Sequence, residues 1–495
     1  MIWCIWFLVK KFYKNTQNLP HLPPGPKGLP FVGNLPFLHL QLQKYFTTLA
    51  QTYGPIISLH LGYKLVVIIS SPSLASEILK DQDIMFANRD VSIAGKVGFY
   101  DGSDILWSPY GPEWRMLRRV CVQELLSGPM LDSTYVLRQN EVRRMVNNLY
   151  VRGMSLVNVG EEVFITMISL ITNMLCGGGG GNEEENKSLV NGLGLVVKEM
   201  IVLLGKPNIS DFFPSLTYFD LQGIEKEMKR LVQKFDNIFE LMVNERTRKD
   251  HEKNNKLRKK DFLQSLLNIR DIGDAKTPLT ITQAKALLMD MIVGGTGTTS
   301  YTMEFALAEM MNNPQVMERA QQELEVVVGA NNMVVESHIH QLPYLKAIMK
   351  ETLRLHPIAP LLAPRCPSES CIVGGYSIPK GTRVCVNVWA NHRDPFIWED
   401  PLKFDPKSFM GSKWDFNGND FKYFPFGSGR RICVGIELAE RMFVLMLASL
   451  VHGFEWKVSN DEKLNLEEKF GIGLRKKKPL MAIPTPRIFN QTLYE

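Results

Sequence analysis

The stretch that decides the fold is FPFGSGRRICVGIELAER, residues Phe424 to Arg441. It is a glycine-rich loop that runs into a predicted helix beginning near Cys433. A cysteine at a helix start meets the positive end of the helix dipole, and the neighbouring Arg430 and Arg431 add positive charge, so both favour thiolate over thiol. Glycines let backbone N–H groups approach the sulfur or a flat ligand. The stretch predicts a thiolate metal ligand at Cys433; the alternative is a buried structural cysteine after a turn.

A long helix is predicted from Ile281 to Met311, about 46 Å at 1.5 Å per residue, long enough to cross the whole domain. Its centre is VGGTGTTS, residues 293–300. Three glycines in mid-helix cost about 1 kcal/mol each relative to alanine, which architecture alone would not select. The glycines therefore indicate a functional segment. The alternative is close helix packing, with threonine hydroxyls bonding back to the helix.

The remainder of the chain is predicted to be mainly helical. Residues 56–71, IISLHLGYKLVVIISS, have the β-branched composition of two strands around a turn at Gly62. Helix-period apolar patterns cover Ala75–Lys80, Met130–Tyr150, Gly223–Arg248, Pro314–Val328 and Tyr344–Leu355. No repeat of fixed period and no second Gly/Pro/Ser linker divides the chain. The prediction is one large domain that is mainly α with a small β-sheet.

Composition narrows the class of protein. The 495 residues are 45% apolar and 22% charged, which are ordinary globular values. A formal charge of +6 on so long a chain is too diffuse to indicate a nucleic-acid partner. The seven cysteines are an odd number without a C-x-x-C pair, so neither a disulfide framework nor a thiolate zinc site is indicated. Reduced thiols that face the cytosol fit best.

The cysteine stretch resembles the F-x-x-G-x-R-x-C-x-G signature of cytochrome P450 enzymes at Phe426, Gly429, Arg431, Cys433 and Gly435. The resemblance implies the cytochrome P450 fold, with haem b held between the long central helix and the cysteine loop. In that family the cysteine is the axial iron ligand, which places Cys433 on the metal, Phe426 beside it and Arg431 on a haem propionate. A thiolate ligand donates electron density to iron and favours O–O cleavage.

Two further motifs occur at the spacing of this family. Lys350-Glu-Thr-Leu-Arg-Leu-His-Pro357 contains an E-x-x-R pair, Glu351 and Arg354, that should brace the loop beneath the haem. The other E-x-x-R matches, Glu141/Arg144, Glu227/Arg230 and Glu245/Arg248, are interpreted as surface ion pairs. Trp114 and Arg118 match W-x-x-x-R, which implies contacts to the haem propionates, and Arg365 is a further propionate candidate.

By resemblance, the glycine-rich centre of the long helix is an oxygen-binding groove in a locally opened helix. Thr298 takes the place of the catalytic alcohol, and Gly294 and Gly295 form the groove. The residue before that threonine is normally acidic but is Gly297 here, which removes a proton-relay group. The arginine that usually completes the E-x-x-R network is replaced by Ser408, which is expected to loosen the haem loop.

The N-terminal residues predict membrane attachment. Residues 1–18 combine an apolar run of eight with lysines, and we interpret them as a short membrane anchor, although about 20 apolar residues are needed to span a bilayer. An ordinary amphipathic helix is the alternative. Residues 19–35 form a proline-rich hinge or an ordered surface arm, and residues 36–495 form the haem-thiolate catalytic domain. The implied location is the cytosolic face of the endoplasmic reticulum membrane.

The resemblance is greatest to plant microsomal A-type members. It implies a monooxygenase that uses O2 and electrons from NADPH, delivered by NADPH-cytochrome P450 reductase docking near Lys422 and Arg430. The expected substrate is lipophilic, a sesquiterpene or other terpenoid, in an apolar pocket of Phe99, Ile105, Leu106, Ile292, Val293, Leu361, Leu362 and Ile472. The alternatives are a flavonoid or phenolic hydroxylase, an oxygen-independent dehydratase or isomerase, and a haem-binding protein with little turnover.

Overall fold

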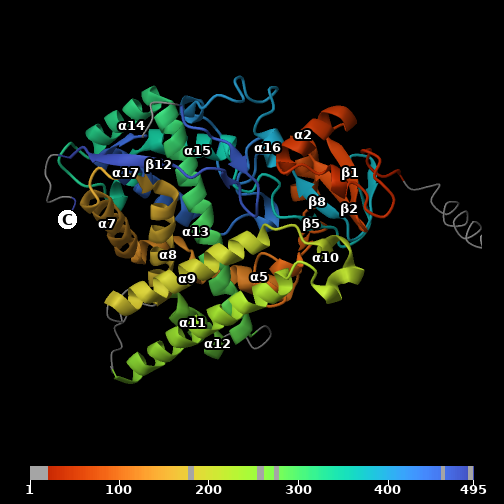
Figure 1. Ribbon diagram of the computed structural model, residues 1–495, viewed down its shortest axis with the longest axis horizontal. Coiled ribbons are helices and arrows are strands. Elements are labelled where there is room, and N and C mark those ends of the chain that lie inside the picture. The colour runs from red at the N-terminus through yellow and green to blue at the C-terminus, as the bar shows by residue number, and fades with distance from the viewer. Residues whose placement is uncertain are drawn as a thin grey trace, which may run out of the picture.

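The computed structural model describes residues 20–176, 183–252, 261–272, 278–458, 463–488 and 494. The fold is mainly helical, as predicted, and helices surround a long central one (Figure 1). The α-helices are α2 (Leu42–Tyr53), α3 (Pro72–Ser76), α4 (Ile93–Gly98), α5 (Pro112–Val120), α6 (Gly128–Ser133), α7 (Tyr135–Val151), α8 (Val159–Cys176), α9 (Glu183–Leu204), α10 (Ile209–Phe212), α11 (Ile224–Glu252), α12 (Phe262–Ile272), α13 (Ile281–Asn312), α14 (Pro314–Val327), α15 (Pro343–Leu355), α16 (Val388–Asn391) and α17 (Ile436–Gly453).

The strands form small sheets at the edges of the helical part. They are β1 (Ile56–Leu61), β2 (Lys64–Ile69), β3 (Asn88–Arg89), β4 (Val157–Asn158), β5 (Arg365–Cys366), β6 (Cys371–Val373), β7 (Tyr376–Ile378), β8 (Arg383–Val386), β9 (Phe454–Lys457), β10 (Glu468–Lys469), β11 (Arg475–Lys476) and β12 (Met481–Pro486). The largest has the order β1-β2-β8-β5-β3. Its first two strands are the predicted antiparallel hairpin, with Ile56 opposite Ile69.

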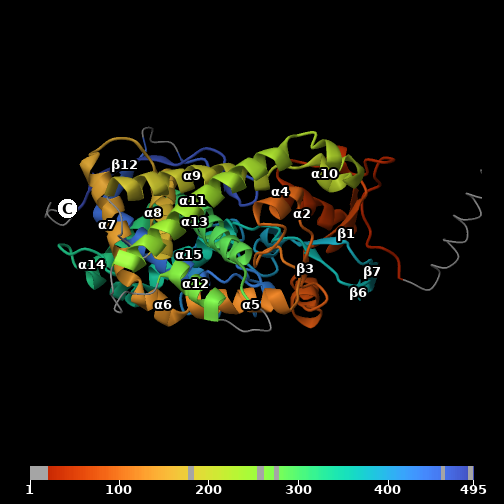
Figure 2. The same ribbon diagram turned by 90° about the horizontal axis from the view of Figure 1, so that it is seen from below.

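Helix α13 is the centre of the core. It packs against α8, α15 and α17, and in Figure 2 it lies between α9 on one edge and α5 and α6 on the other. A capping box between Thr280 and Gln283 fixes its start. The predicted long helix is therefore confirmed. The local opening implied by the family resemblance is absent, because α13 is helical without interruption over 32 residues.

Two other predicted boundaries differ from the structure. The helix predicted over residues 130–150 is divided into α6 and α7 at Thr134, whose hydroxyl donates to the carbonyls of Met130 and Leu131 and so satisfies the end of α6. The helix expected to start near Cys433 begins at Ile436 instead. Cys433 therefore lies in the loop before the helix.

The proline-rich segment is an ordered arm in its described part, residues 20–35. Ser58 N donates to the carbonyl of Pro24 at 2.9 Å, so the arm runs along β1. A Cβ at Gly25 would overlap the Ser58 carbonyl oxygen, and one at Gly33 would overlap that of His60. Glycine is needed at both points because the arm approaches the strand backbone so closely.

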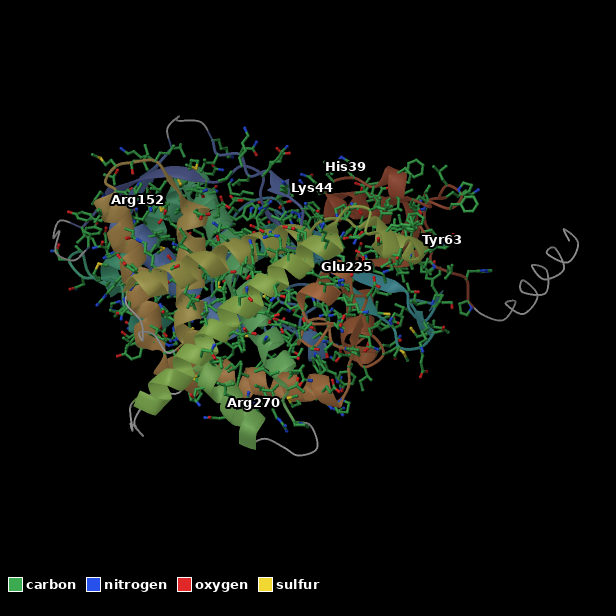
Figure 3. The ribbon with its side chains drawn as sticks, turned by 60° about the horizontal axis from the view of Figure 1, so that its bottom comes forward. His39, Lys44, Tyr63, Arg152, Glu225 and Arg270 are labelled. Atoms are coloured by element: carbon green, nitrogen blue, oxygen red, sulfur yellow. The ribbon has the colours of Figure 1, made fainter. Side chains whose placement is uncertain are left out.

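The proposed anchor, residues 1–18, lies outside the described residues. Within the part of the chain that the structure describes, every helix is too short or too polar to cross a bilayer. The hairpin of β1 and β2 lies beside α10, where Tyr63 N donates to the Phe212 carbonyl at 3.1 Å and the Tyr63 ring meets Phe213 edge to face (Figure 3).

The buried pair Glu351 and Arg354 of α15 holds the segment that leads to the cysteine loop. Arg354 Nε and Nη2 donate to the two carboxylate oxygens of Glu351 at 2.6 and 2.8 Å. Its other N–H groups donate to the carbonyls of His392, Pro401 and Lys403 at 2.9, 2.8 and 2.9 Å. All five guanidinium donors are therefore satisfied, which is what a buried charge requires.

Ser408 does not leave this network open. Asp405 N donates to Glu351 Oε1 at 2.7 Å, and Ser408 Oγ donates to the Asp405 carbonyl at 2.8 Å. Backbone groups of residues 401–405 thus provide the hydrogen-bond partners of Glu351 and Arg354 in the absence of the family's usual arginine.

His392 joins this network to the cysteine loop, a role that the sequence analysis did not assign. Its carbonyl accepts from Arg354, and its ring Nε2 accepts from Phe424 N at 3.2 Å. Burial and two nearby arginines lower the pKa of His392 to about 3, so the ring is neutral and can accept this bond. No sequence signal identified it, because the link depends on a contact between residues 32 positions apart.

Replacing Arg354 with Lys should destabilise the protein strongly. Lysine has three donors instead of five, so buried carbonyl groups or a Glu351 oxygen lose their partners, and breaking a buried pair costs about 3 to 5 kcal/mol. Urea unfolding followed by tryptophan fluorescence measures the loss. The matched control is Arg230→Lys, which alters an E-x-x-R pair whose side chains are both 42% exposed. Equal unfolding midpoints for the two variants would contradict the structural role.

Candidate functional site

The cysteine loop is closed by backbone hydrogen bonds at its two ends. Cys433 N donates to the Phe426 carbonyl at 3.1 Å, and Gly435 N donates to Cys433 Sγ at 3.3 Å. Phe426 is half-buried, with its ring edge to face with Phe416. The sulfur is therefore fixed by a backbone N–H group of the loop, three residues before α17 begins.

Gly429 and Asp83 fasten the other side of the loop. Gly429 has a φ of +68°, and a Cβ there would overlap the Leu79 carbonyl and lie 2.7 Å from Asp83 Oδ1, so only glycine fits. Asp83 Oδ2 accepts from Arg430 N at 3.0 Å and from Arg430 Nη1 at 2.8 Å. The Arg430 side chain is therefore held by Asp83. Asp83 was not predicted from the sequence, since a lone aspartate carries no motif.

Cys433 lies inside the molecule but keeps accessible surface. Its side chain has accessible surface, but the protein that surrounds it excludes most of the water, and this desolvation raises the pKa of the thiol. The Gly435 N–H and the positive charge of Arg118 act in the opposite direction and favour thiolate. The cation that acts on the sulfur is thus Arg118, not Arg430 or Arg431 as predicted. An accessible interior cysteine beside a cation fits an axial ligand of haem iron.

Three buried guanidinium groups gather near the loop. Burial lowers the pKa of Arg89, Arg365 and Arg431, and neighbouring arginines lower those of Arg89 and Arg431 further, the latter to about 10. Asp83 and Asp104 balance only part of this charge. The cluster therefore suits the two propionate carboxylates of haem b. Arg89 was not predicted from the sequence.

The structure shows which protein groups hold these arginines. Arg431 donates to the carbonyls of Ala87, Ile105 and Ser108. Arg89 donates to those of Leu106 and Ala363. Arg365 donates to the Ser428 carbonyl and to the Asp83 carboxylate. Arg365 and Arg431 thus connect the cysteine loop to segments far away in the sequence.

Trp114 and Arg118 of α5 differ in what they offer a cofactor. Trp114 Nε1 donates to the Ile105 carbonyl at 3.0 Å, so a protein group already engages the indole N–H that the resemblance assigned to a propionate. The Arg118 guanidinium lies 5.7 Å from the Trp114 ring and has no hydrogen-bond or ion-pair partner among the described residues. Arg118 is therefore the cation of this motif that remains available to an anionic group.

The three glycines of α13 have different surroundings. A Cβ at Gly294 would meet nothing within 4 Å. Gly294 and Thr298, four residues apart on one face, are both exposed within the largely buried middle of the helix. A Cβ at Gly295 would lie 2.6 Å from Ile171 of α8, and one at Gly297 3.0 Å from Ile201 of α9. Gly295 and Gly297 thus permit close helix packing, which was the alternative interpretation, whereas Gly294 leaves open surface.

The Thr298 hydroxyl donates to the Gly294 carbonyl at 2.6 Å. This is the back-bonding expected of a threonine in a helix, and it orients the hydroxyl oxygen on the open face. Thr298 can therefore accept a hydrogen bond from a group bound on that face while its own proton remains on the helix carbonyl.

The predicted pocket residues separate into two groups. Phe99, Ile292 and Leu361 have exposed fractions of at most 7% and pack in the core. Those with accessible surface are Ile105, Leu106, Val293, Leu362 and Ile472, of which the last is 42% exposed. Only the second group can present surface to a ligand.

Comparison with known proteins agrees with this geometry. The family described as Cytochrome P450 matches residues 23–483. The chain is 39% identical to a flavonoid 3'-monooxygenase of Petunia hybrida over 98% of this chain and 96% of that protein, and 39% identical to a flavonoid 3',5'-hydroxylase of Solanum melongena over 94% and 91%. A solved zebra fish cytochrome P450 with abiraterone shares the fold, with a TM-score of 0.76 at 24% identity over 90% of this chain and 99% of that one.

One explanation accounts for four observations: the signature residues at the cysteine loop, the interior thiol, the excess of buried guanidinium groups and the match over nearly the whole chain. The chain belongs to the cytochrome P450 family, whose members are haem-thiolate monooxygenases.

Proposed function

We propose that this enzyme hydroxylates a flavonoid or a related phenolic. The observation that carries the proposal is 39% identity to flavonoid hydroxylases along almost the whole of each chain. The relatives favour this alternative over the terpenoid reading that the sequence analysis preferred. Because the relatives are named as monooxygenases, they also favour oxygen insertion over dehydration, isomerisation or simple haem binding.

The chain's own residues have definite tasks in such a reaction. When bound, haem b supplies the chemistry that splits O2 and inserts one oxygen atom into a C–H bond of the substrate. Cys433 would hold the iron, while Arg89, Arg118, Arg365 and Arg431 are the candidates to hold the propionates.

Thr298 presents its hydroxyl oxygen on the open face of α13. Ile105, Leu106, Val293 and Leu362 offer apolar surface for a flat aromatic ring. These side chains exclude water from the reacting carbon and orient it, while the hydroxyl oxygen of Thr298 accepts a hydrogen bond from the group that delivers the proton.

The electron donor in this proposal is NADPH-cytochrome P450 reductase, on the cytosolic face of the endoplasmic reticulum membrane. Lys422 and Arg430 lie exposed close to the cysteine loop and suit an acidic partner. Arg430 is also engaged by Asp83, so Lys422 is the cleaner position at which to test docking by charge reversal.

The first prediction from the proposed function concerns the metal ligand. Carbon monoxide added to the reduced haem protein should give the absorption band of a thiolate-ligated haem, and Cys433→Ser should abolish that band because an alcohol is a much poorer anionic ligand than a thiol. Cys121→Ser is a matched control, since that thiol is fully buried and has a strongly raised pKa. Retention of the band in Cys433→Ser would refute the assignment.

The second prediction concerns the substrate. With reductase and NADPH, a flavonoid that carries one hydroxyl on its B ring should gain a second one next to it, and it should also give a substrate-binding spectrum. A sesquiterpene should do neither. Product analysis by mass spectrometry, with reactions lacking NADPH as controls, makes the measurement. Turnover of the sesquiterpene without turnover of any flavonoid would restore the terpenoid reading.

The third prediction concerns Gly297, which leaves Thr298 without an adjacent carboxylate. Some reducing equivalents should leak to hydrogen peroxide, and Gly297→Asp should raise the product formed per NADPH consumed by supplying a relay group. Any side chain here must displace the Ile201 methyl group, so Gly297→Ala is the control for packing alone. If Asp and Ala give the same ratio, or Asp lowers it with haem content intact, another proton path operates.

A further inference from the structure

Two carboxyl groups from different elements meet beneath the loop between α4 and α5. Asp104 belongs to that loop and is fully buried, whereas Asp290 belongs to α13 and is largely buried. The two carboxyl groups lie within hydrogen-bonding reach of each other. Neither residue has a role in the reaction described above.

Each carboxyl group also binds the backbone of the loop. Ile105 N donates to Asp290 Oδ2 at 2.9 Å, and Trp107 N donates to Asp104 Oδ1 at 3.0 Å. The second oxygen, Asp104 Oδ2, is buried and accepts from no N–H or O–H donor in the described part of the chain. A buried oxygen of this kind needs a donor. A proton on Asp290 would supply one.

The surroundings indicate which member of the pair holds the proton. Arg89 of β3 and Arg431 of the cysteine loop act on Asp104 and favour its charged form. Among the described residues, the strongest electrostatic neighbour of Asp290 is Asp104 itself, and the buried thiol of Cys121, which follows α5, is a further titratable group beside it. Burial together with Asp104 therefore raises the pKa of Asp290 well above the usual carboxyl range, and burial raises that of Asp104.

The loop that the pair holds is part of the site. The Ile105 carbonyl accepts from both Trp114 Nε1 and Arg431 Nη1, at 3.0 and 2.9 Å. Ile105 is therefore joined to α13 through its N–H group and to Arg431 of the cysteine loop through its carbonyl. Asp290 precedes Gly294 by four residues and Thr298 by eight, which places all three on one face of α13. The pair thus fastens the loop at one end of the open face.

We propose that Asp104 and Asp290 share one proton and form a proton-dependent clamp that positions residues 104–107 against the substrate side of α13. With the proton present, Asp290 donates to Asp104 and the loop is held. When it is lost, two adjacent carboxylates repel each other in a poorly solvated place, and the loop is released. The proposal rests on the proposed function only in taking Ile105 and Leu106 as substrate contacts.

The sign of the pH dependence follows from the direction of both pKa shifts. Groups whose pKa is raised on folding bind more protons in the folded state, so their contribution to stability is full at acidic pH. That contribution declines as the pH rises through the folded-state values. Order in the loop and affinity for substrate should therefore both decrease toward alkaline pH.

The experiment measures amide hydrogen exchange of Ile105 and Trp107 in the haem-loaded full-length protein, corrected for intrinsic rates, at about pH 6.5 and about pH 9. Spectral titration with a B-ring monohydroxylated flavonoid is run alongside. In the unaltered protein, protection and flavonoid affinity should each fall about tenfold between the two conditions, which corresponds to about one pKa unit of differential interaction.

Asp290→Asn should remove this dependence, leaving less than about a twofold change, because the amide donates to Asp104 without titrating and still accepts from Ile105 N. Asp104→Asn is the second variant and should do the same if Asp290→Asn fails to fold. Asp101→Asn alters an exposed carboxylate of the same loop and should behave like the unaltered protein.

Equal pH dependence in the unaltered protein and both asparagine variants would overturn the clamp, and so would exchange of Ile105 and Trp107 that ignores pH throughout. If the exchange result holds but no flavonoid binds, the substrate proposal fails and the clamp stands. If flavonoids bind, but neither their affinity nor the amide exchange of Ile105 and Trp107 depends on pH, the clamp fails and the substrate proposal stands.

Discussion

The structure of the site depends on one fully satisfied buried charge, the Arg354 guanidinium. Its five donors join α15 to the backbone at residues 392–403, and His392 passes that constraint on to Phe424 at the start of the cysteine loop. A guanidinium can brace irregular backbone in this way because it is planar, always charged and rich in donors. The position of Cys433 is thus set from a helix about eighty residues earlier in the chain.

Electrostatics gives the two sides of the site opposite characters. Near the cysteine loop, the buried arginines Arg89, Arg365 and Arg431 outnumber the acidic groups beside them, which favours an anionic cofactor. Beside the open face of α13 the notable groups are acidic, namely Asp290 of the helix and Asp104 of the loop between α4 and α5. Ile105 touches both sides, since its carbonyl meets Arg431 and its N–H meets Asp290. This loop is therefore where changes in cofactor and substrate binding can be coupled.

The centre of α13 shows how one sequence feature can serve two purposes. Gly295 and Gly297 allow α8 and α9 to approach the helix, whereas Gly294 leaves its face open beside Thr298. Packing also explains why position 297 carries no acidic residue, because Ile201 occupies the space that a side chain would need. A relay carboxylate and this close contact with α9 exclude each other unless Ile201 moves.

The sequence by itself determined the family, the long helix, the hairpin of β1 and β2 and the selection of Glu351/Arg354 among four E-x-x-R matches. These depend on local spacing, periodicity and turn residues, which are properties of neighbouring positions. Only the tertiary structure decided that Arg118 rather than Arg430 acts on the sulfur, that Phe99 and Ile292 belong to the core, and that Asp83, Arg89 and His392 hold the site. The physical reason is that burial and hydrogen-bond partners join residues tens or hundreds of positions apart, and no local pattern in the sequence records which of them will meet.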